Sequence, residues 1–224
     1  VAGGTSKTVF VFDVESLKLL HKLKGHTDIV SRIIYSPDGK EIVSSGVDNK
    51  IIFWDSQSGE LKKTIATNYK INHFAFHPDG KTMAVTGEGK IIQFFDVATG
   101  KEIQSIVNKP NILWLAYSPD GKYLSAGCID SKVRVFDPVK KKLLYTLSGH
   151  KRSLANVIYS QDGKKLYSTG WDGKICIWDM EKKGKLLYSK DLTYDSIYEL
   201  NLHPNGKQIA FGSRDCIVGV LKLD

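Results

Sequence analysis

Short runs with the character of β-strands alternate with polar turns along the whole chain. Between residues 29 and 65, for example, such runs cover residues 29–36, 41–46, 50–54 and 60–65. The breaks between them are rich in Gly, Pro, Asp and Asn, which favour tight turns. No segment keeps apolar residues at helical spacing, so the pattern predicts an all-β protein.

The third run of each group is apolar on both of its faces. Residues 51–54 read IIFW and residues 175–178 read ICIW. A strand of this kind must be covered on both sides. Four-stranded antiparallel sheets stacked between similar sheets meet that demand, and radial repetition of such sheets gives a β-propeller.

Two markers repeat in phase along the chain. The first is a turn that starts at residues 36, 77, 118, 160 and 203, at steps of 41, 41, 42 and 43 residues. The second is an aromatic-Asp pair that ends the third run, and it starts at residues 12, 54, 95, 136 and 178. A single period in two independent markers predicts one structural unit, repeated as a blade.

These markers predict one β-propeller domain over residues 1–224. Complete blades are expected at 29–65, 71–106, 112–147 and 153–189, with partial blades at 1–23 and 196–224. Because the strands at 8–12 and 216–221 would duplicate each other, we expect the chain to be part of a larger propeller of about seven blades. Completion of the propeller by a partner chain or a symmetry mate is the alternative.

The motif set of two blades resembles that of the WD-repeat β-propellers. It consists of a Gly-His pair, a strand serine, a turn aspartate and a Trp-Asp pair, and the likeness weakens in the other blades. The resemblance implies two structural hydrogen-bonded tetrads. They are His26, Ser44, Asp48 and Trp54, and His150, Ser168, Asp172 and Trp178.

A serine, a histidine and an aspartate also suggest a hydrolase. A nucleophile, however, needs an exposed position beside an oxyanion site, and here the set recurs at equal spacing and decays gradually between copies. Catalysis in the channel would need convergent carboxylates or histidines, but only scattered polar residues such as Asn72, His73, Asn156 and Glu199 occur near the inner strands. We therefore expect no catalytic residue and no enzyme activity.

The same resemblance places ligands on the loops around the channel mouth. The relevant positions are those just before each turn aspartate and those leading into each innermost strand. The expected protein-binding residues are Trp171, Arg214, Tyr194, Lys70, Lys109, Lys151, Ile129, Val47 and Ile29. The aromatic and basic members favour an acidic or phosphorylated peptide as partner.

The composition adds a moderate basic character. The formal net charge is +8, and the three cysteines are too sparse for a disulfide framework, so they are expected to be buried thiols of an intracellular, cytoplasmic or nuclear protein. No apolar run is long enough to cross a bilayer, and no metal-ligand spacing or cofactor motif occurs.

Two functions follow. The first is a non-catalytic scaffold that binds other proteins within a multiprotein assembly. The alternative is an RNA-contacting propeller subunit of a ribonucleoprotein complex, which draws on the net charge and on the Lys, Trp and Tyr residues of the loops.

Overall fold

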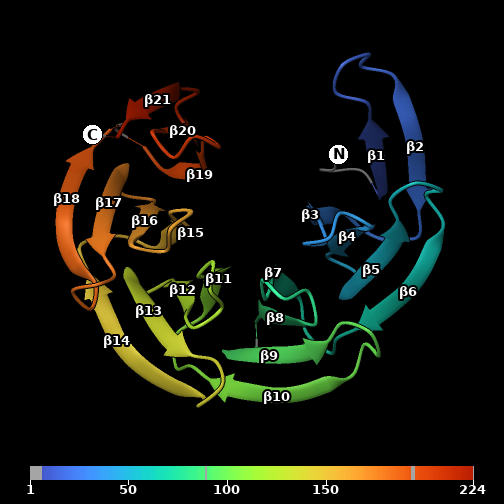
Figure 1. Ribbon diagram of the computed structural model, residues 1–224, viewed down its shortest axis with the longest axis horizontal. Helices are drawn as coiled ribbons and strands as arrows, with labels where there is room; N and C mark the ends of the chain where they lie inside the picture. The colour runs from blue at the N-terminus through green and yellow to red at the C-terminus, as the bar shows by residue number, and fades with distance from the viewer. Residues whose placement is uncertain (1–6, 89, 193–194, 224) are drawn as a thin grey trace. The chain divides into compact units, whose positions relative to one another are not determined.

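The computed structural model describes residues 7–88, 90–192 and 195–223 (Figure 1). These residues form 21 β-strands, and no helix occurs among them. The all-β class and the four-stranded antiparallel blades of a β-propeller are therefore confirmed. The chain divides into two compact units, Val1–Gly89 with Gln93–Gln104 and Lys90–Ile92 with Ser105–Asp224. The assignment of residues 1–224 to one domain stays a prediction.

The N-terminal part of the chain holds a two-stranded sheet and two four-stranded sheets, ordered β1-β2, β3-β4-β5-β6 and β10-β9-β8-β7. The strands are β1 (Thr8–Phe12), β2 (Leu19–Lys24), β3 (Val30–Tyr35), β4 (Glu41–Gly46), β5 (Lys50–Asp55), β6 (Leu61–Ala66), β7 (Ile71–Phe76), β8 (Thr82–Gly87), β9 (Ile91–Asp96) and β10 (Glu102–Val107).

The C-terminal part holds two four-stranded sheets and one three-stranded sheet, ordered β11-β12-β13-β14, β15-β16-β17-β18 and β19-β20-β21. The strands are β11 (Ile112–Tyr117), β12 (Leu124–Cys128), β13 (Lys132–Asp137), β14 (Lys142–Ser148), β15 (Leu154–Tyr159), β16 (Lys165–Gly170), β17 (Lys174–Asp179), β18 (Lys185–Asp191), β19 (Ile197–Leu202), β20 (Gln208–Ser213) and β21 (Val218–Lys222). In this unit the innermost strands β11, β15 and β19 lie side by side.

The repeat is also visible in the strand register. The first strand of each described three- or four-stranded sheet shifts register against the second just after its first residue, as between Leu154 and Asn156 of β15. A recurring bulge of this kind is a property of the blade and not a local defect.

Each sheet has a loop end and a turn end. The loop end carries the segment that enters the first strand and the hairpin between the second and third strands. The turn end carries the hairpin between the first and second strands and the link between the third and fourth. At the turn end, the Met180 amide donates to the Lys164 carbonyl at 2.8 Å and so joins link to hairpin.

The third strands are buried on both faces, as their sequences predict. Ile51, Ile52, Phe53 and Trp54 of β5 are all buried, and Trp178 of β17 shares one core cluster with Val133 of β13. That cluster contains residues of the β11–β14 and β15–β18 sheets, so each of these two sheets shields the apolar face of the other from water.

One residue of the outer strand fixes this stacking in the second unit. Leu147 of β14 is buried, and it packs against Gly184 in the link between β17 and β18. Gly184 has a φ of +77°, and a Cβ there would lie 2.3 Å from Leu147 Cδ2. Both the backbone conformation and the close approach therefore require glycine.

Replacing Gly184 with alanine should destabilise the protein by about 2–4 kcal/mol, because the left-handed conformation and the contact with Leu147 both disfavour a Cβ. Urea denaturation measures this loss. Gly206→Ala is the matched control, since Gly206 has a φ of +72° with nothing within 4 Å. It should cost only about 1–2 kcal/mol, and equal losses in the two variants would show that sheet stacking contributes nothing at Gly184.

Candidate functional site

The four residues of the first predicted tetrad meet at the loop end of the β3–β6 sheet. His26 Nδ1 lies 2.9 Å from Asp48 Oδ1, and His26 Nε2 lies 2.8 Å from Ser44 Oγ. The Trp54 indole donates to the same Ser44 oxygen at 2.9 Å. One continuous chain of hydrogen bonds thus ties the entering loop to strands β4 and β5.

The second predicted tetrad repeats this geometry in the β15–β18 sheet. His150 Nδ1 lies 3.0 Å from Asp172 Oδ1, His150 Nε2 lies 2.9 Å from Ser168 Oγ, and the Trp178 indole donates to Ser168 Oγ at 2.9 Å. The Asp172 carboxylate also accepts the Lys151 amide at 2.8 Å.

The electrostatics of this tetrad favour charged partners. Burial disfavours the charged form of Asp172, but hydrogen bonds from His150 and the Lys151 amide outweigh it and lower the pKa of the carboxyl. Burial likewise disfavours the imidazolium, yet the bond to Asp172 and the neighbouring Cys176 raise the pKa of His150 to about 9. The His150 ring then donates from both nitrogens, to Asp172 and to Ser168.

A glycine stands beside each tetrad. A Cβ at Gly46 would lie 2.6 Å from both Asp48 Oδ1 and His26 Nδ1, and a Cβ at Gly170 would lie 3.0 Å from His150 Nδ1. The strand pairing puts Cys128 at the equivalent place in the β11–β14 sheet. That sheet has Asn108 where the histidine would stand, so a side chain fits there.

The β11–β14 sheet replaces the tetrad with an ion pair. Arg134 donates to both carboxylate oxygens of Asp130, at 2.8 and 2.6 Å. The bond from Arg134 lowers the pKa of Asp130 although burial opposes it. Asn108 Nδ2 donates to the Pro110 carbonyl at 2.8 Å, so the entering loop is tied internally.

The first unit shows a third arrangement, without a histidine. The Tyr69 hydroxyl donates to Gln93 Oε1, and Gln93 Nε2 donates to Glu102 Oε2 at 2.6 Å. Burial raises the pKa of the Tyr69 phenol. The four-stranded sheets therefore use three different kinds of side-chain hydrogen bonding, and the tetrad is shared by two of them.

The tetrad chemistry does not suit a nucleophile. Ser44 and Ser168 are fully buried, and each hydroxyl oxygen accepts a tryptophan indole, so no substrate carbonyl can approach. No group of three His, Cys, Asp or Glu side chains among the described residues is placed to hold a metal ion.

In the second unit, the structure brings the predicted binding residues to the loop end. Ile129 and Trp171, with exposed fractions of 47% and 37%, lie in the hairpins before Asp130 and Asp172. Lys109 and Lys151 are exposed on entering loops, and Arg214 is exposed in the hairpin after β20. These residues come from adjoining sheets of one unit.

The first unit holds the remaining described members of that set. The Val47 amide donates to the Ile29 carbonyl at 2.9 Å, and the Glu88 amide donates to the Lys70 carbonyl at 3.1 Å, which places all three predicted residues at loop ends. Ile29 and Lys70 are exposed, and Val47 is half-buried. Tyr194 lies outside the described residues.

Sequence reasoning did not predict the hydrogen bonds that hold Trp171 in place. The Trp171 amide donates to the Ser153 carbonyl at 2.9 Å, while the Trp171 carbonyl accepts Arg152 Nη1 at 2.9 Å and Ser196 Oγ at 3.4 Å. Arg152 follows the predicted Lys151 directly, and its position in an entering loop was the available signal. Nothing in the sequence indicated that Arg134 would pair with Asp130, because only the folded sheet brings the two side chains together.

The prediction that all three cysteines are buried is wrong for one of them. Cys128 and Cys176 are buried, whereas Cys216 is exposed. Cys216 has a φ of +62° in the hairpin between β20 and β21, so it is a turn residue and not part of a strand.

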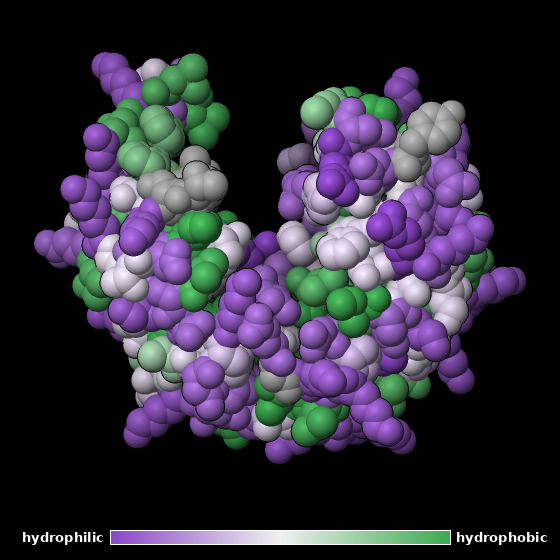
Figure 2. Space-filling view, turned by 180° about the vertical axis from the view of Figure 1, so that it is seen from behind, coloured by the Kyte–Doolittle hydropathy of each residue, from purple (hydrophilic) through white to green (hydrophobic). Residues whose placement is uncertain are grey.

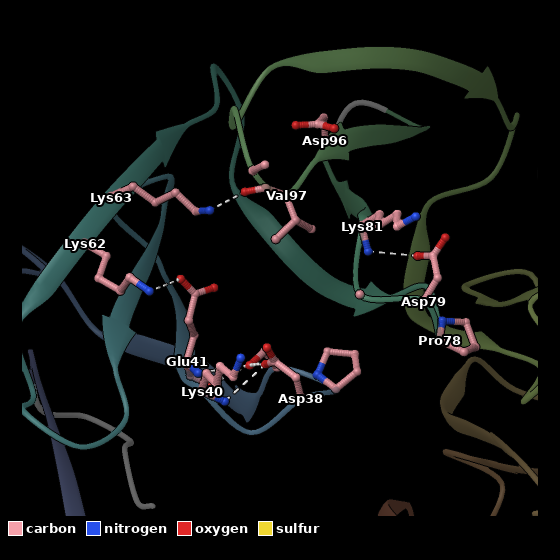
Figure 3. Close-up of a pocket in the computed structure, with 14 residues that line it drawn as sticks. Asp38, Lys40, Glu41, Lys62, Lys63, Pro78, Asp79, Lys81, Asp96 and Val97 are labelled. Atoms are coloured by element: carbon pink, nitrogen blue, oxygen red, sulfur yellow. Dashed lines mark hydrogen bonds and ion pairs between the residues drawn. The ribbon is translucent and has the colours of Figure 1, made fainter.

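The first unit also contains a cleft of about 660 Å³ at its turn end, lined by the hairpins after β3 and β7 and by nearby strand residues (Figure 3). Lys62 points at Glu41 with 3.0 Å between their charged atoms, and Lys63 donates to the Val97 carbonyl. Four lysines and four carboxylates line the cleft, so it carries no net charge. This balance gives no reason to assign it a charged ligand.

Within the described ranges, no helix has the length and apolar character needed to span a membrane.

Comparison with known proteins matches the repeat to sequence families. The model described as WD domain, G-beta repeat matches residues 17–55, 100–137 and 141–179, which together cover just over half of the chain. The model of the anaphase-promoting complex subunit 4 WD40 domain matches residues 63–115.

Individual relatives match over shorter stretches. Ribosome assembly protein 4 of Saccharomyces cerevisiae is 34% identical over 65 residues, which are 29% of this chain and 13% of that protein. Small ribosomal subunit protein RACK1 of Drosophila melanogaster is 33% identical over 76 residues, 34% of this chain and 24% of that protein. An uncharacterized WD repeat-containing protein of Synechocystis is 53% identical over 47 residues, 20% of this chain and 14% of that protein. The matches thus span less than a quarter of each relative's length.

Replacing Ser168 with alanine should destabilise the protein by about 1–3 kcal/mol, because the buried Trp178 indole and His150 Nε2 lose their partner. Chemical denaturation measures the loss. Ser148→Ala, at an exposed strand position in the same unit, should change stability by less than about 0.5 kcal/mol. A Ser168 variant as stable as this control would exclude a structural role for the tetrad.

The coupling between His150 and Asp172 should depend on pH with a defined sign. Because the pKa of His150 rises from 6.5 to about 9 on folding, its contribution is full below pH 6.5 and is lost as pH rises toward 9. Because the pKa of Asp172 falls below 3.8 on folding, its contribution is present above that pH and is lost in more acidic solution.

A double-mutant cycle with His150→Gln and Asp172→Asn, followed by urea denaturation from pH 3 to 9, should therefore give its largest coupling free energy between about pH 4 and 6.5. A cycle between His150→Gln and Asp191→Asn serves as the control and should stay near zero throughout. Coupling that grows between pH 6.5 and 9 contradicts the assignment.

Proposed function

The chain belongs to the WD40-repeat family, and we propose that it is a non-catalytic scaffold that binds other proteins through the loop ends of its blades. The polar side chains of the two tetrads are engaged with one another inside the blades, and loops are the surface where binding residues usually lie. In the space-filling view, hydrophilic side chains dominate the visible face and hydrophobic ones gather in small separate patches (Figure 2). Such a surface favours localised anchor residues over one broad apolar interface.

The placement of Trp171 is the single observation that carries this proposal. Its indole is partly exposed, while its backbone is held by Ser153, Arg152 and Ser196 from two entering loops. A large aromatic side chain on a fixed backbone loses little conformational entropy on binding. Tryptophan and arginine are also the residue types that most often dominate interface energies.

The charges around Trp171 support an acidic or phosphorylated segment as the partner. Lys151, Arg152 and Arg214 are exposed at the same loop end, where Asp195 Oδ2 lies 3.9 Å from Arg214 Nε. A phosphate or carboxylate accepts paired hydrogen bonds from a guanidinium group, which the exposed arginines can supply.

The names of two relatives are consistent with work inside an assembly. One is a ribosome assembly protein and one is a small ribosomal subunit protein. For the present chain, membership of a multiprotein assembly is part of the proposal, because each match covers a small part of those proteins.

The double variant Trp171→Ala with Arg214→Ala should lose at least about tenfold of its affinity for captured partners, the effect expected when interface anchors are truncated. Its thermal unfolding temperature should change little, because both side chains are exposed. Affinity capture from native extract with quantitative mass spectrometry, followed by binding titration of the recovered partner, provides the measurement.

Tyr188→Ala with Lys190→Ala is the matched control. It removes one exposed aromatic and one exposed cation from the outer strand β18 of the same unit. Full binding by the control and weakened binding by the loop variant support the proposal. Unchanged binding by the loop variant excludes this surface.

A further inference from the structure

The net positive charge of the chain lies entirely in its second unit. The residues of the first unit include 12 Lys and Arg and 12 Asp and Glu, whereas those of the second include 20 and 12. The formal charge of +8 is therefore a property of the C-terminal part of the protein. Four of its cations, Lys109, Lys151, Arg152 and Arg214, belong to the loop end described above.

Much of this charge gathers at the turn end of the second unit. Neighbouring hairpins there are in contact: a Cβ at Gly163 would lie 3.4 Å from Pro119 Cδ, and Gln161 Nε2 donates to the Pro204 carbonyl at 2.6 Å. We call this surface the second-unit turn rim. It comprises residues 118–123, 137–142, 160–165, 179–185 and 203–208.

The second-unit turn rim carries ten lysines and five carboxylates. The lysines are Lys122, Lys140, Lys141, Lys142, Lys164, Lys165, Lys182, Lys183, Lys185 and Lys207. The corresponding hairpins and links of the first unit, residues 13–18, 36–41, 55–60, 77–82 and 96–101, carry four lysines and eight carboxylates. The fold is the same in both, so it does not dictate the lysines.

The carboxylates of the rim do not neutralise these lysines. Asp137 accepts the amides of Val139 and Lys140 at 3.0 and 2.8 Å, so it is held within its own link. The ion pair between Lys182 and Asp179 spans 3.4 Å and exposes most of the lysine, and such surface pairs are weak.

Five exposed lysines of the rim have no acidic partner within 4.0 Å among the described residues: Lys141, Lys142, Lys183, Lys185 and Lys207. Lys165, which is half-buried, has none either.

The backbone tolerates a lysine at a link corner where two other links carry glycine. Lys141 has a φ of +54° at the corner of its link, where the links after β5 and β9 carry Gly59 and Gly100 with φ of +74° and +69°. A residue with a Cβ is disfavoured in this region. Leu17, with a φ of +55° in the first link, shows that the corner accepts other residues, so the lysine is tolerated there and not required.

We propose that the second-unit turn rim binds the phosphate backbone of double-helical RNA. Closely spaced phosphates match repeated cations on successive hairpins, and release of their counterions drives such binding. The rim contains no arginine, the residue that most often reads base edges, and no exposed Phe, Tyr or Trp side chain to stack on unpaired bases. The remaining mode of binding is contact with the backbone of a duplex. Double-stranded RNA suits this mode, because its A-form shape is recognised without reading the bases.

An anionic membrane fits the rim less well. Membrane association needs buried apolar area in addition to charge. The one large aliphatic side chain exposed in these segments is Val139, at the tip of a single link.

The test is a fluorescence anisotropy titration of a labelled RNA duplex of about 20 base pairs at several salt concentrations, with the variant Lys141→Gln, Lys142→Gln, Lys183→Gln and Lys185→Gln. At about 100 mM salt the Kd should rise at least tenfold. The slope of the logarithm of the binding constant against the logarithm of the salt concentration should become less negative by up to about 3.6, which is near 0.9 for each of the four lost phosphate contacts.

The matched control removes four lysines from the first unit, with Lys18→Gln, Lys40→Gln, Lys81→Gln and Lys101→Gln. It changes the net charge by the same amount and should leave the Kd within about twofold, as should Trp171→Ala with Arg214→Ala. The loop variant thereby separates this proposal from the scaffold function. If the quadruple rim variant unfolds below assay temperature, Lys142→Gln with Lys185→Gln, at the first positions of β14 and β18, replaces it and should weaken binding at least threefold.

Three results would overturn the proposal. They are absence of salt-dependent binding of the RNA duplex by the unaltered protein, equal losses in the rim and control variants, and tighter binding to a DNA duplex of equal length or to phosphatidylserine vesicles than to the RNA. Retention of binding when the same four lysines become arginine supports a role of charge alone.

Discussion

The structure depends on one constraint: strands that are apolar on both faces can be stable only between two neighbouring sheets. Trp54 and Trp178 illustrate it, because each is buried at the end of a third strand that has no solvent face. Leu147 shows how closely the cover must fit, since only a glycine at position 184 leaves room for it. The repeat of about 41 residues seen in the sequence corresponds to one sheet, and each further sheet covers the strands of the sheet before it.

Close stacking leaves polar groups at the loop ends that water cannot reach, and the four-stranded blades bind them in three different ways. Two sheets use Ser, His, Asp and Trp, one uses Arg134 with Asp130, and the first unit adds Tyr69 with Gln93. Gly46 and Gly170 accompany the histidine, while Cys128 takes the equivalent place where the histidine is absent. In these three sheets, the space beside the aspartate holds either an imidazole or a side chain on the neighbouring strand.

The sequence was sufficient to predict the strands, the turns and both tetrads, because each depends on residues at fixed short spacing. It was insufficient for contacts that only the sheets bring together. Arg134 looks like an ordinary strand residue until β13 places it beside Asp130, and Arg152 looks like a solvated loop cation until its guanidinium reaches the Trp171 carbonyl. Cys216 was misassigned because a closing strand pattern hides the left-handed turn in which it lies.

The two ends of the blades are under different constraints, and this difference explains why the surface charge can be uneven. At the loop end, side chains such as His150 are tied into the interior, so the sequence there is restricted to sets that satisfy buried groups. At the turn end, hairpins and links close through local hydrogen bonds, as when the Asp137 carboxylate accepts the amides of Val139 and Lys140, and the outward side chains are left unspecified. Lysines can therefore accumulate on the second-unit turn rim without disturbing the fold. A concentration of one charge where stability does not require it is best understood as selection for what that surface contacts.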